Sequence, residues 1–515
     1  MSSTPVGEGY FTGADYTAHY FRDLNPLRVE FTLLVEGLDT PAPGPCCELG
    51  FGQGVSMAVH AAGDTSRTWW GCDLMASHAH HAQQLVGAAG VDAKAANQSF
   101  ADFCARDDLP QFAFIGLHGV WSWVSAANRA LIADFLRRQL RPGGAVYISY
   151  NALAGWTPLL PLRSLMVDHD GSLGAAALPA VERMRAAAAF AERLLAIDSP
   201  LVRGIPGLRA TFGNEVAKAP EYLLHEYLGG DWHHSSLAQL AAQLEPAQLV
   251  WATGTELLHR LPNIYLTPQQ QQFLASVPAP LLRESARDIF VGQGLRRDLF
   301  VRGPRRLTVA EQRERLDVVH LVLAQHPSQV ADKIAGPVAE AQLPPRALHS
   351  IVQALSAAEG AITVGEVCRR VQADNIEAAE TLALLTTLVG SGTVDVAVSP
   401  AQTARSRPAT DRLNTHLLCR ATVRSDLETL ASPVTGGGVA ATVMQQKLLA
   451  ASLNDPNHPA TWAALLSQAL QGSGQKLQHD GKVLTTAAEM RPLLQPAVDR
   501  FVQLELPVFK RLQVV

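Results

Sequence analysis

Residues 48–54 read Glu-Leu-Gly-Phe-Gly-Gln-Gly and follow an apolar run that we expect to form a buried β-strand. Gly50, Gly52 and Gly54 let the backbone adopt left-handed conformations, so that N–H groups approach a ligand closely. The helix that follows adds partial positive charge at its N-terminus. A dinucleotide site would instead have the spacing G-x-G-x-x-G, without an acid directly before it. Because Glu48 would repel a pyrophosphate, the loop favours a cationic ligand.

S-adenosylmethionine (SAM) is a nucleoside that fits these requirements. It carries an α-ammonium and a sulfonium but no phosphate, and the carboxylate of Glu48 can attract its methionine part. Asp73 ends the next predicted strand, Trp69-Trp-Gly-Cys-Asp73, where a carboxylate accepts hydrogen bonds from both ribose hydroxyls. The sequence therefore predicts SAM as the cofactor, bound by Glu48, Asp73 and the three loop glycines.

The loop belongs to a βαβ series, in which strand-like runs alternate with helical spacers. Such alternation is typical of an α/β fold with a parallel sheet covered by helices. We expect a Rossmann-like class I methyltransferase domain, whose sheet needs two further strands, the last one antiparallel. The predicted strands are Pro45–Leu49, Arg67–Asp73, Val91–Asn97, Gln111–His118, Gly144–Tyr150, Gln248–Gly254 and Arg296–Gly303.

Further cofactor contacts are predicted where the other strands end. Asn97 and Ser99 follow the third strand, at the level where polar groups read the adenine edge, and Phe100 can pack on its face. Tyr16 and Tyr20, near the N-terminus, are predicted to fold over the cofactor; for both, plain packing is the alternative.

Candidate catalytic residues follow the fourth and fifth strands, whose ends face the ligand crevice of a doubly wound sheet. Leu117 and His118 are predicted to lie beside the cofactor, and His118 can remove a proton from the nucleophile or simply cap a loop. Trp121 is the candidate aromatic wall for a cationic methyl donor, although Trp123 competes because alternate residues face opposite ways. Tyr150 can orient the acceptor or merely end its strand.

The domain plan combines an α/β core with helical and α+β parts. A helical region interrupts the methyltransferase sheet, and three helices followed by a turn and strand at 390–398 suggest a winged-helix-like domain. Residues 399–408 are predicted to be a linker. The predicted domains are 1–157 (methyltransferase core), 158–245 (helical insertion or regulatory region), 246–305 (completion of the sheet), 306–400 (winged-helix-like) and 411–515 (a second winged-helix-like domain).

Composition bounds the remaining function classes. The net charge is −5 and the winged-helix-like helices carry no basic stripe, so nucleic acid is not favoured as a partner. No long apolar run predicts membrane insertion, and six cysteines without a CxxC pair favour a cytoplasmic protein. We expect no metal, since His225-Glu226 and His233-His234 are adjacent pairs without a third ligand at suitable spacing. The C-terminal domains are expected to serve homodimerisation or acceptor docking.

Several separated motifs resemble one known family, bacterial class I SAM-dependent methyltransferases with a methyltransferase regulatory domain. This family includes outer-membrane-protein lysine methyltransferases. The resemblance implies methyl transfer to a protein side chain, with the lysine amine favoured. A small-molecule N- or O-methyltransferase and a non-catalytic SAM-binding regulator are the alternatives. The matching motifs are 48–54, Leu117-His-Gly-Val-Trp-Ser-Trp-Val124, 140–144, Tyr147-Ile-Ser-Tyr-Asn151, Gly155-Trp156, Tyr222-Leu-Leu-His-Glu-Tyr-Leu228, Asp288-Ile-Phe and Arg296-Arg-Asp-Leu-Phe-Val-Arg302.

Overall fold

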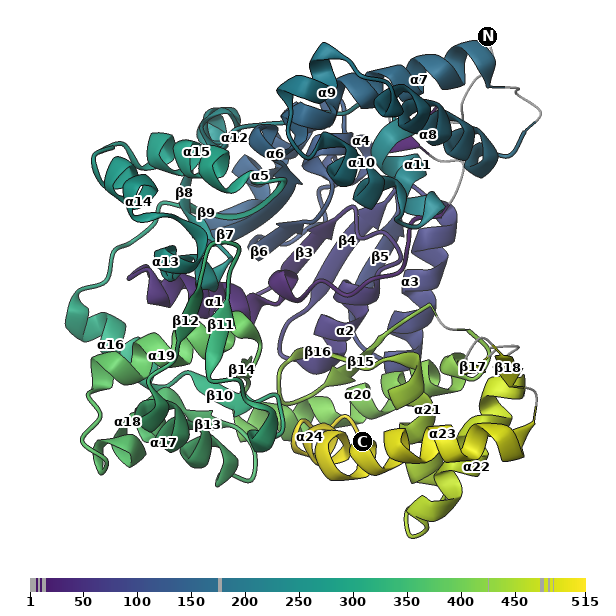
Figure 1. Ribbon diagram of the computed structural model, residues 1–515. Helices are drawn as coiled ribbons and strands as arrows, with labels where there is room; N and C mark the ends of the chain where they lie inside the picture. The colour runs from purple at the N-terminus through teal and green to yellow at the C-terminus, as the bar shows by residue number, and fades with distance from the viewer. Residues whose placement is uncertain are drawn as a thin grey trace.

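A seven-stranded sheet forms the centre of the computed structural model (Figure 1). The structure describes residues 6–7, 10–11, 15–174, 178–424, 426–472, 477–479, 482–484 and 486–515. The strand order is β5-β4-β3-β6-β7-β9-β8, in which only β9 runs antiparallel to its neighbours. The strands are β3 (Cys46–Leu49), β4 (Trp69–Asp73), β5 (Ala93–Asn97), β6 (Phe112–Leu117), β7 (Leu140–Asn151), β8 (Leu249–Gly254) and β9 (Leu295–Arg302).

Helices cover both faces of this sheet, as the βαβ pattern predicted. One face packs on α1 (Pro26–Val35), α2 (Val55–Gly63) and α3 (Ala76–Ala89), and the other on α4 (Phe100–Cys104), α5 (Ala126–Gln139) and α12 (Leu237–Leu244). Because parallel strands need helical crossovers, both faces are covered, and the central strands β3 and β6 are buried along their whole length. All seven predicted strands are present, and the class I methyltransferase fold is confirmed.

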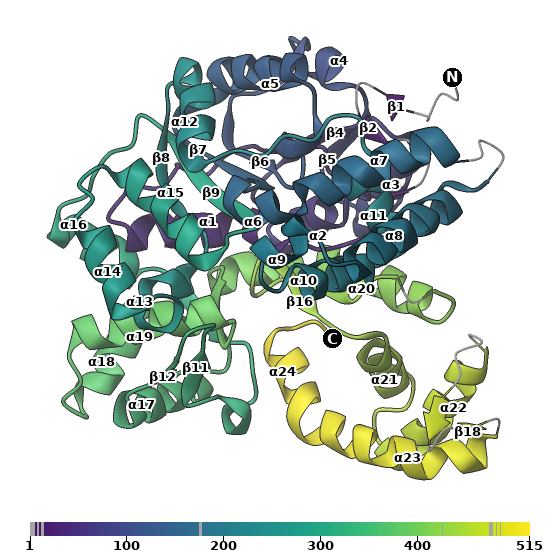
Figure 2. The same cartoon turned by 45° about the horizontal axis from the view of Figure 1, so that its top comes forward.

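A helical layer stands over the carboxyl ends of the strands, on the opposite side from the C-terminal helices (Figures 1 and 2). It has its own apolar core, which includes Met166, Leu195, Phe212 and Tyr227. The chain then returns through α12 to β8, and α13 (Pro262–Tyr265), α14 (Pro268–Ala275) and α15 (Pro280–Val291) connect β8 to β9, which completes the sheet. The other elements are α6 (Leu153–Trp156), α7 (Leu160–Leu173), α8 (Ala180–Ala196), α9 (Pro200–Gly204), α10 (Leu208–Val216) and α11 (Pro220–Leu228).

The three helices predicted within 306–400 and the strand that follows them are present. Strand β14 (Val394–Ala397) pairs with β10 (His320–Leu323), which precedes all three helices, and β10 also pairs with β13 (Ile362–Thr363). The likeness to a winged helix stays a prediction. The other elements are α16 (Val309–Asp317), β11 (Lys333–Ala335), β12 (Glu340–Gln342), α17 (Pro345–Ser356), α18 (Val364–Gln372) and α19 (Ala378–Ser391).

The linker prediction for 399–408 is wrong, because these residues begin α20 (Pro400–Ala421). Ser399 and Gln402 form a capping box, Pro400 occupies the first turn, and Pro408 is tolerated inside the helix. Helix α20 packs on α2 and α3, so the C-terminal part shares one core with the sheet domain. It continues with β15 (Thr429–Ser432), β16 (Gly437–Ala440), α21 (Val443–Asn454), α22 (Pro459–Gly472), β17 (Leu477–His479), β18 (Lys482–Leu484), α23 (Ala487–Arg500) and α24 (Leu506–Arg511).

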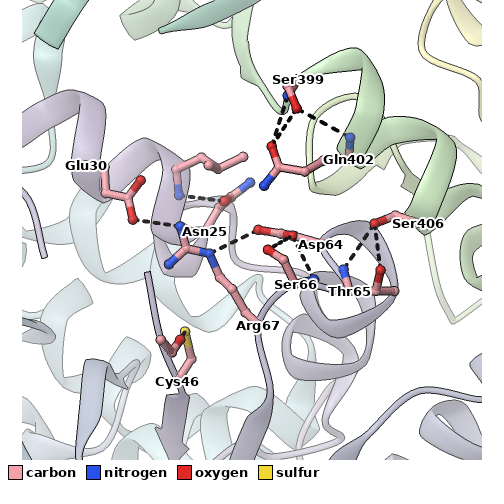
Figure 3. A network of polar contacts seen from close by, with 12 residues as sticks. Asn25, Glu30, Cys46, Asp64, Thr65, Ser66, Arg67, Ser399, Gln402 and Ser406 are labelled. Carbon is pink, nitrogen blue, oxygen red and sulfur yellow. Dashed lines mark hydrogen bonds and ion pairs between the residues drawn. The ribbon is translucent and has the colours of Figure 1, made fainter. Parts of the chain in front are cut away.

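A buried arginine joins these layers below the sheet (Figure 3). Arg67, which precedes β4, donates to Asp64 Oδ2 at 3.0 Å and to Glu30 Oε1 on α1 at 2.7 Å. The neighbouring backbone N–H of Thr65 donates to Ser406 Oγ on α20 at 3.0 Å. The arginine thus fixes the loop on which α20 rests. Within the described ranges, no helix is long and apolar enough to cross a membrane.

Replacing Arg67 by Met is expected to destabilise the protein by about 3–5 kcal/mol, because the Asp64 and Glu30 carboxylates would remain buried without their cation. Urea unfolding followed by tryptophan fluorescence measures this loss. The matched control is Arg137→Met on α5, whose partner Asp134 is half exposed, and its cost should stay below about 1 kcal/mol. Equal losses in the two variants would contradict the assigned role of Arg67.

Candidate functional site

A cavity of about 970 Å³ opens at the carboxyl ends of β3, β4, β6 and β7. This volume lies at the upper end of the range for small-molecule sites, which is roughly 300–1,000 Å³. Its walls come from the glycine loop, from residues 15–25, which we call the strap, and from helices α10 and α11 above. The predicted site residues that line it are Tyr16, Tyr20, Glu48, Gly50, Gly52, Asp73, Phe100 and His118.

The glycine loop has the left-handed backbone that its sequence predicts. The φ angles of Gly50, Gly52 and Gly54 are 69°, 55° and 70°. A Cβ on Gly50 would lie 2.6 Å from Val120, and one on Gly54 would lie 2.3 Å from Ala82, whereas Gly52 has no atom within 4 Å. Gly54 therefore serves helix packing and does not line the cavity, while Gly52 leaves open space beside it.

Glu48 is the most unusual group of the cavity wall. Its side chain is only 3% exposed, and its Oε2 atom is buried with no hydrogen-bond partner among the described residues. Burial, and then the nearby Asp73, raise the pKa of this carboxyl to about 8. Burying a carboxylate without a partner is unfavourable, so the arrangement suits a ligand that brings a cationic donor.

Asp73 holds the glycine loop in place. Its Oδ2 accepts the backbone N–H of Gly52 at 2.8 Å, and its Oδ1 accepts from Met75 N at 3.0 Å. Its Oδ1 also lies 3.1 Å from Nδ1 of buried His78, whose Nε2 accepts the backbone N–H of Tyr16. His78 is therefore the neutral Nδ1–H tautomer. A carboxylate oxygen accepts about two hydrogen bonds, so Oδ2 can still receive a ribose hydroxyl.

The strap closes the cavity from the N-terminal side. The carbonyl of Tyr16 accepts from the Gln53 side chain at 3.1 Å, and the Tyr16 ring stands edge-on to His225 on α11, with centroids 5.2 Å apart. Tyr20 lines the cavity as well, but its hydroxyl lies 3.0 Å from His60 Nε2 on α2. The Tyr16 ring thus lies in the cavity wall against α11, whereas the Tyr20 hydroxyl is directed to α2; a cofactor contact of either ring stays a prediction.

Of the three residues predicted on the adenine side, only one lines the cavity. Phe100 lines the cavity, together with Leu74 and Gln98, which the sequence did not single out. The side chain of Asn97 instead donates to the carbonyls of residues 73 and 74, and Ser99 caps α4 through Asp102 N. These two residues shape the loops around the cavity without lining it.

His118 lies in the cavity wall between two rings. It stacks on Phe21 of the strap, with centroids 3.7 Å apart, and its Nδ1 lies 2.8 Å from the Tyr147 hydroxyl. Burial, followed by the charges of Arg297 and His19, lowers its pKa to about 3. A histidine that is neutral throughout the physiological range and so weakly basic is a poor general base.

Trp121, Tyr150 and Leu117 do not line the cavity, contrary to their predicted roles. Trp121 is fully buried and its indole N–H donates to Gln243 of α12. The Tyr150 hydroxyl donates to Asp298 at 2.9 Å, and Leu117 packs in the core beneath the strand end. The competing tryptophan, Trp123, faces the cavity instead.

The other side of the cavity is lined mostly by residues that the sequence reasoning did not assign. Helix α10 contributes Glu215, α11 contributes Tyr222 and Glu226, and Lys218 lies between the two helices. Asn151 of β7, next to the predicted Tyr150, also lines the cavity. Glu226 is 7% exposed, and burial raises its pKa to about 8. The motif Tyr222-Leu-Leu-His-Glu-Tyr-Leu228 was the available signal, but its histidine and glutamate drew attention only as metal ligands.

Comparisons with known proteins agree with this geometry. Residues 219–302, from α11 to β9, match the family described as "Predicted methyltransferase regulatory domain". PKMT2 from Rickettsia typhi, solved in complex with AdoHcy, superimposes with a TM-score of 0.68 at 16% identity over 97% of this chain and 99% of that one. This chain has a class I methyltransferase fold. It is also 29% identical to the uncharacterised Synechocystis protein sll1526, over 98% of this chain and 99% of that one.

Replacing Glu48 by Gln should stabilise the ligand-free protein at alkaline pH. The folded state raises this pKa above the unfolded value of 4.5, so ionised Glu48 costs stability increasingly as pH rises from 4.5 towards 8. The gain from the substitution is at most about 5 kcal/mol and disappears below pH ~4. Urea unfolding at pH 5 and pH 9 measures it. A variant that is less stable than the wild type at pH 9 would contradict the unpaired state of Glu48.

Proposed function

We propose that this protein is a cytoplasmic SAM-dependent methyltransferase that modifies a protein side chain, with the lysine amine as the favoured acceptor. One observation carries the proposal: Glu48 presents a buried, unpartnered carboxylate oxygen beside a left-handed glycine loop, at the end of the first strand of a methyltransferase sheet. The α-ammonium of SAM would supply the cationic hydrogen-bond donor that this oxygen lacks.

The remaining cofactor contacts follow if the α-ammonium binds at Glu48. Asp73 would accept a ribose hydroxyl through Oδ2, Gly52 leaves room for close approach, and Phe100 offers its ring to the adenine. Bound SAM supplies an electrophilic methyl group on a sulfonium. The residues around it exclude water and hold the acceptor in line, which is the main contribution that methyl transfer requires from a protein.

The lysine preference rests on architecture and likeness. PKMT2 from Rickettsia typhi, solved in complex with AdoHcy, matches the chain over nearly its full length, including the parts outside the sheet. The sequence motifs resemble a family that includes outer-membrane-protein lysine methyltransferases. A small-molecule enzyme rarely needs such accessory domains. His118 is assigned to packing against the strap and not to catalysis, because of its low pKa and its two stacked neighbours.

Calorimetry with SAM and S-adenosylhomocysteine tests the cofactor assignment. Glu48→Gln and Asp73→Asn should each weaken binding by about 10-fold or more, since a charged hydrogen bond contributes roughly 1.5–3 kcal/mol. Glu182→Gln, an exposed carboxylate on α8, is the matched control and should bind as the wild type does. The assignment fails if the wild type binds neither compound.

The affinity for SAM should also depend on pH. Below about pH 8 the Glu48 carboxyl of the free protein is mostly protonated, so binding must expel a proton and weakens by up to ~10-fold per pH unit. Above about pH 8 the α-amine of SAM loses its own proton. We expect a maximum near pH 8 for the wild type and no acidic decline in Glu48→Gln. An affinity that is flat from pH 6 to pH 8 in the wild type would contradict this pairing.

Incubating the protein with methyl-labelled SAM and a bacterial lysate identifies the acceptor class. Label in protein, recovered as methyl-lysine after hydrolysis, is the expected result. Label in small molecules would favour the small-molecule enzyme, and binding without transfer would favour the non-catalytic regulator. The same protein, unfolded by heating before the incubation, gives the background level of label.

A further inference from the structure

Five acidic side chains line the cavity, and four of them already have an assigned partner or role. Asp23 lies 3.7 Å from Arg297, and both oxygens of Glu215 accept from Lys218, at 2.7 and 2.8 Å. Glu48 faces the cofactor end and Asp73 holds the glycine loop. Glu226 remains: Tyr222 and Asn151 hydrogen-bond to its side chain, but no ion pair ties it to a cation within the described parts of the chain.

Aromatic rings accompany Glu226 on this wall. The ring centroids of Tyr16 and Tyr222 are 6.4 Å apart, and Tyr16 belongs to the strap that also contacts the glycine loop through Gln53. Trp123 faces the same cavity, next to Gly229 at the end of α11. Aromatic faces attract ammonium groups, more strongly where water is excluded.

The wall already holds one ammonium of its own. Lys218 Nζ lies over the Tyr222 ring, 5.2 Å from its centroid, while the Glu215 carboxylate pairs with it. An acid and an aromatic ring thus bind a lysine head group here within the same chain. Glu226 and the rings of Tyr222 and Tyr16 offer a second arrangement of that kind, one that lacks its lysine.

We propose that Glu226 is the residue that binds and deprotonates the methyl acceptor, a primary alkylammonium that enters among Tyr16, Tyr222 and Trp123. This inference rests on the proposed function and specifies its acceptor site. In the proton-transfer step an N–H bond of the ammonium breaks and an O–H bond forms on Glu226. The freed lone pair on nitrogen then bonds to the methyl carbon, and the electrons of the broken C–S bond stay on sulfur.

The surroundings of Glu226 suit this role. Burial raises its pKa most, Glu215 adds to the rise, and Lys218, Tyr222 and Asn151 lower it, which leaves a pKa of about 8. His225 and Tyr16 complete the neighbouring titratable groups. A base is most effective when its pKa lies near the working pH. A neutral hydroxyl acceptor lacks the positive charge that the carboxylate and the aromatic rings attract.

Infrared difference spectroscopy on the protein saturated with S-adenosylhomocysteine tests the proposal, since Glu48 is then paired. At pH 7 the wild type should show the carbonyl band of a protonated carboxyl that n-butylammonium removes and n-butanol does not. Glu226→Gln should lack this response, Glu226→Asp should retain it in part, and Glu182→Gln should match the wild type.

Methyl transfer into the labelled protein fraction provides the second readout. Glu226→Gln should lower it by about 10²–10⁴-fold with unchanged affinity for SAM, as expected for loss of a general base. A wild type that ignores n-butylammonium, or a Glu226→Gln variant with full transfer, overturns the proposal. If S-adenosylhomocysteine does not bind at all, the proposed function itself fails. Normal binding without an amine response rejects only the role of Glu226.

Discussion

The rest of the cavity depends on one constraint, a buried carboxylate oxygen that has no hydrogen-bond partner among the described residues. Glu48 sits at the end of a fully buried strand, where its ionised form is costly unless a cation arrives. The left-handed Gly52 leaves open space beside the cavity, and Asp73 fixes the loop through the Gly52 N–H. The strap and α11 then separate the space from bulk water. Each element preserves an environment that becomes favourable only with a ligand bound.

The sheet could be predicted almost completely from the sequence. Buried parallel strands read as near-continuous apolar runs, and in residues 45–150 each such run lies between helical spacers. The pattern alone therefore predicts these strands. The two closing strands were predicted because two strand-like runs follow the helical region and a class I methyltransferase sheet needs two further strands. The stretch 399–408 misled, because Ser, Pro and Gln are loop-formers by composition, yet Ser399 and Gln402 cap a helix whose stability comes from packing on α2 and α3.

The candidate site was predicted where it depends on strand ends and missed where it depends on tertiary packing. Glu48 and Asp73 lie at the ends of strands, and Gly52 and Phe100 follow within three residues, so their positions in sequence fix their positions in space. Trp121 and Trp123 are two residues apart in a short 3₁₀ turn, and sequence alone cannot decide which one turns inward. Tyr150 was predicted to orient the acceptor, but its hydroxyl donates to Asp298, which lies 148 residues away in the sequence. Glu226 lies on α11, in the helical layer over the strand ends, and its place beside the cavity depends on how that layer packs on the sheet.

The packing of α20 on α2 and α3 has a consequence for how this architecture can be inherited. Leu413 and Leu417 of α20 share one core with Val59 and Leu85 of the sheet domain, so neither side presents a finished surface to solvent. A unit joined by a common core cannot be shuffled among proteins as a module joined by a flexible tether can. The correspondence with the Synechocystis protein over 99% of its length is what such a joint would preserve. Catalytic and accessory parts then accumulate substitutions as one structural body.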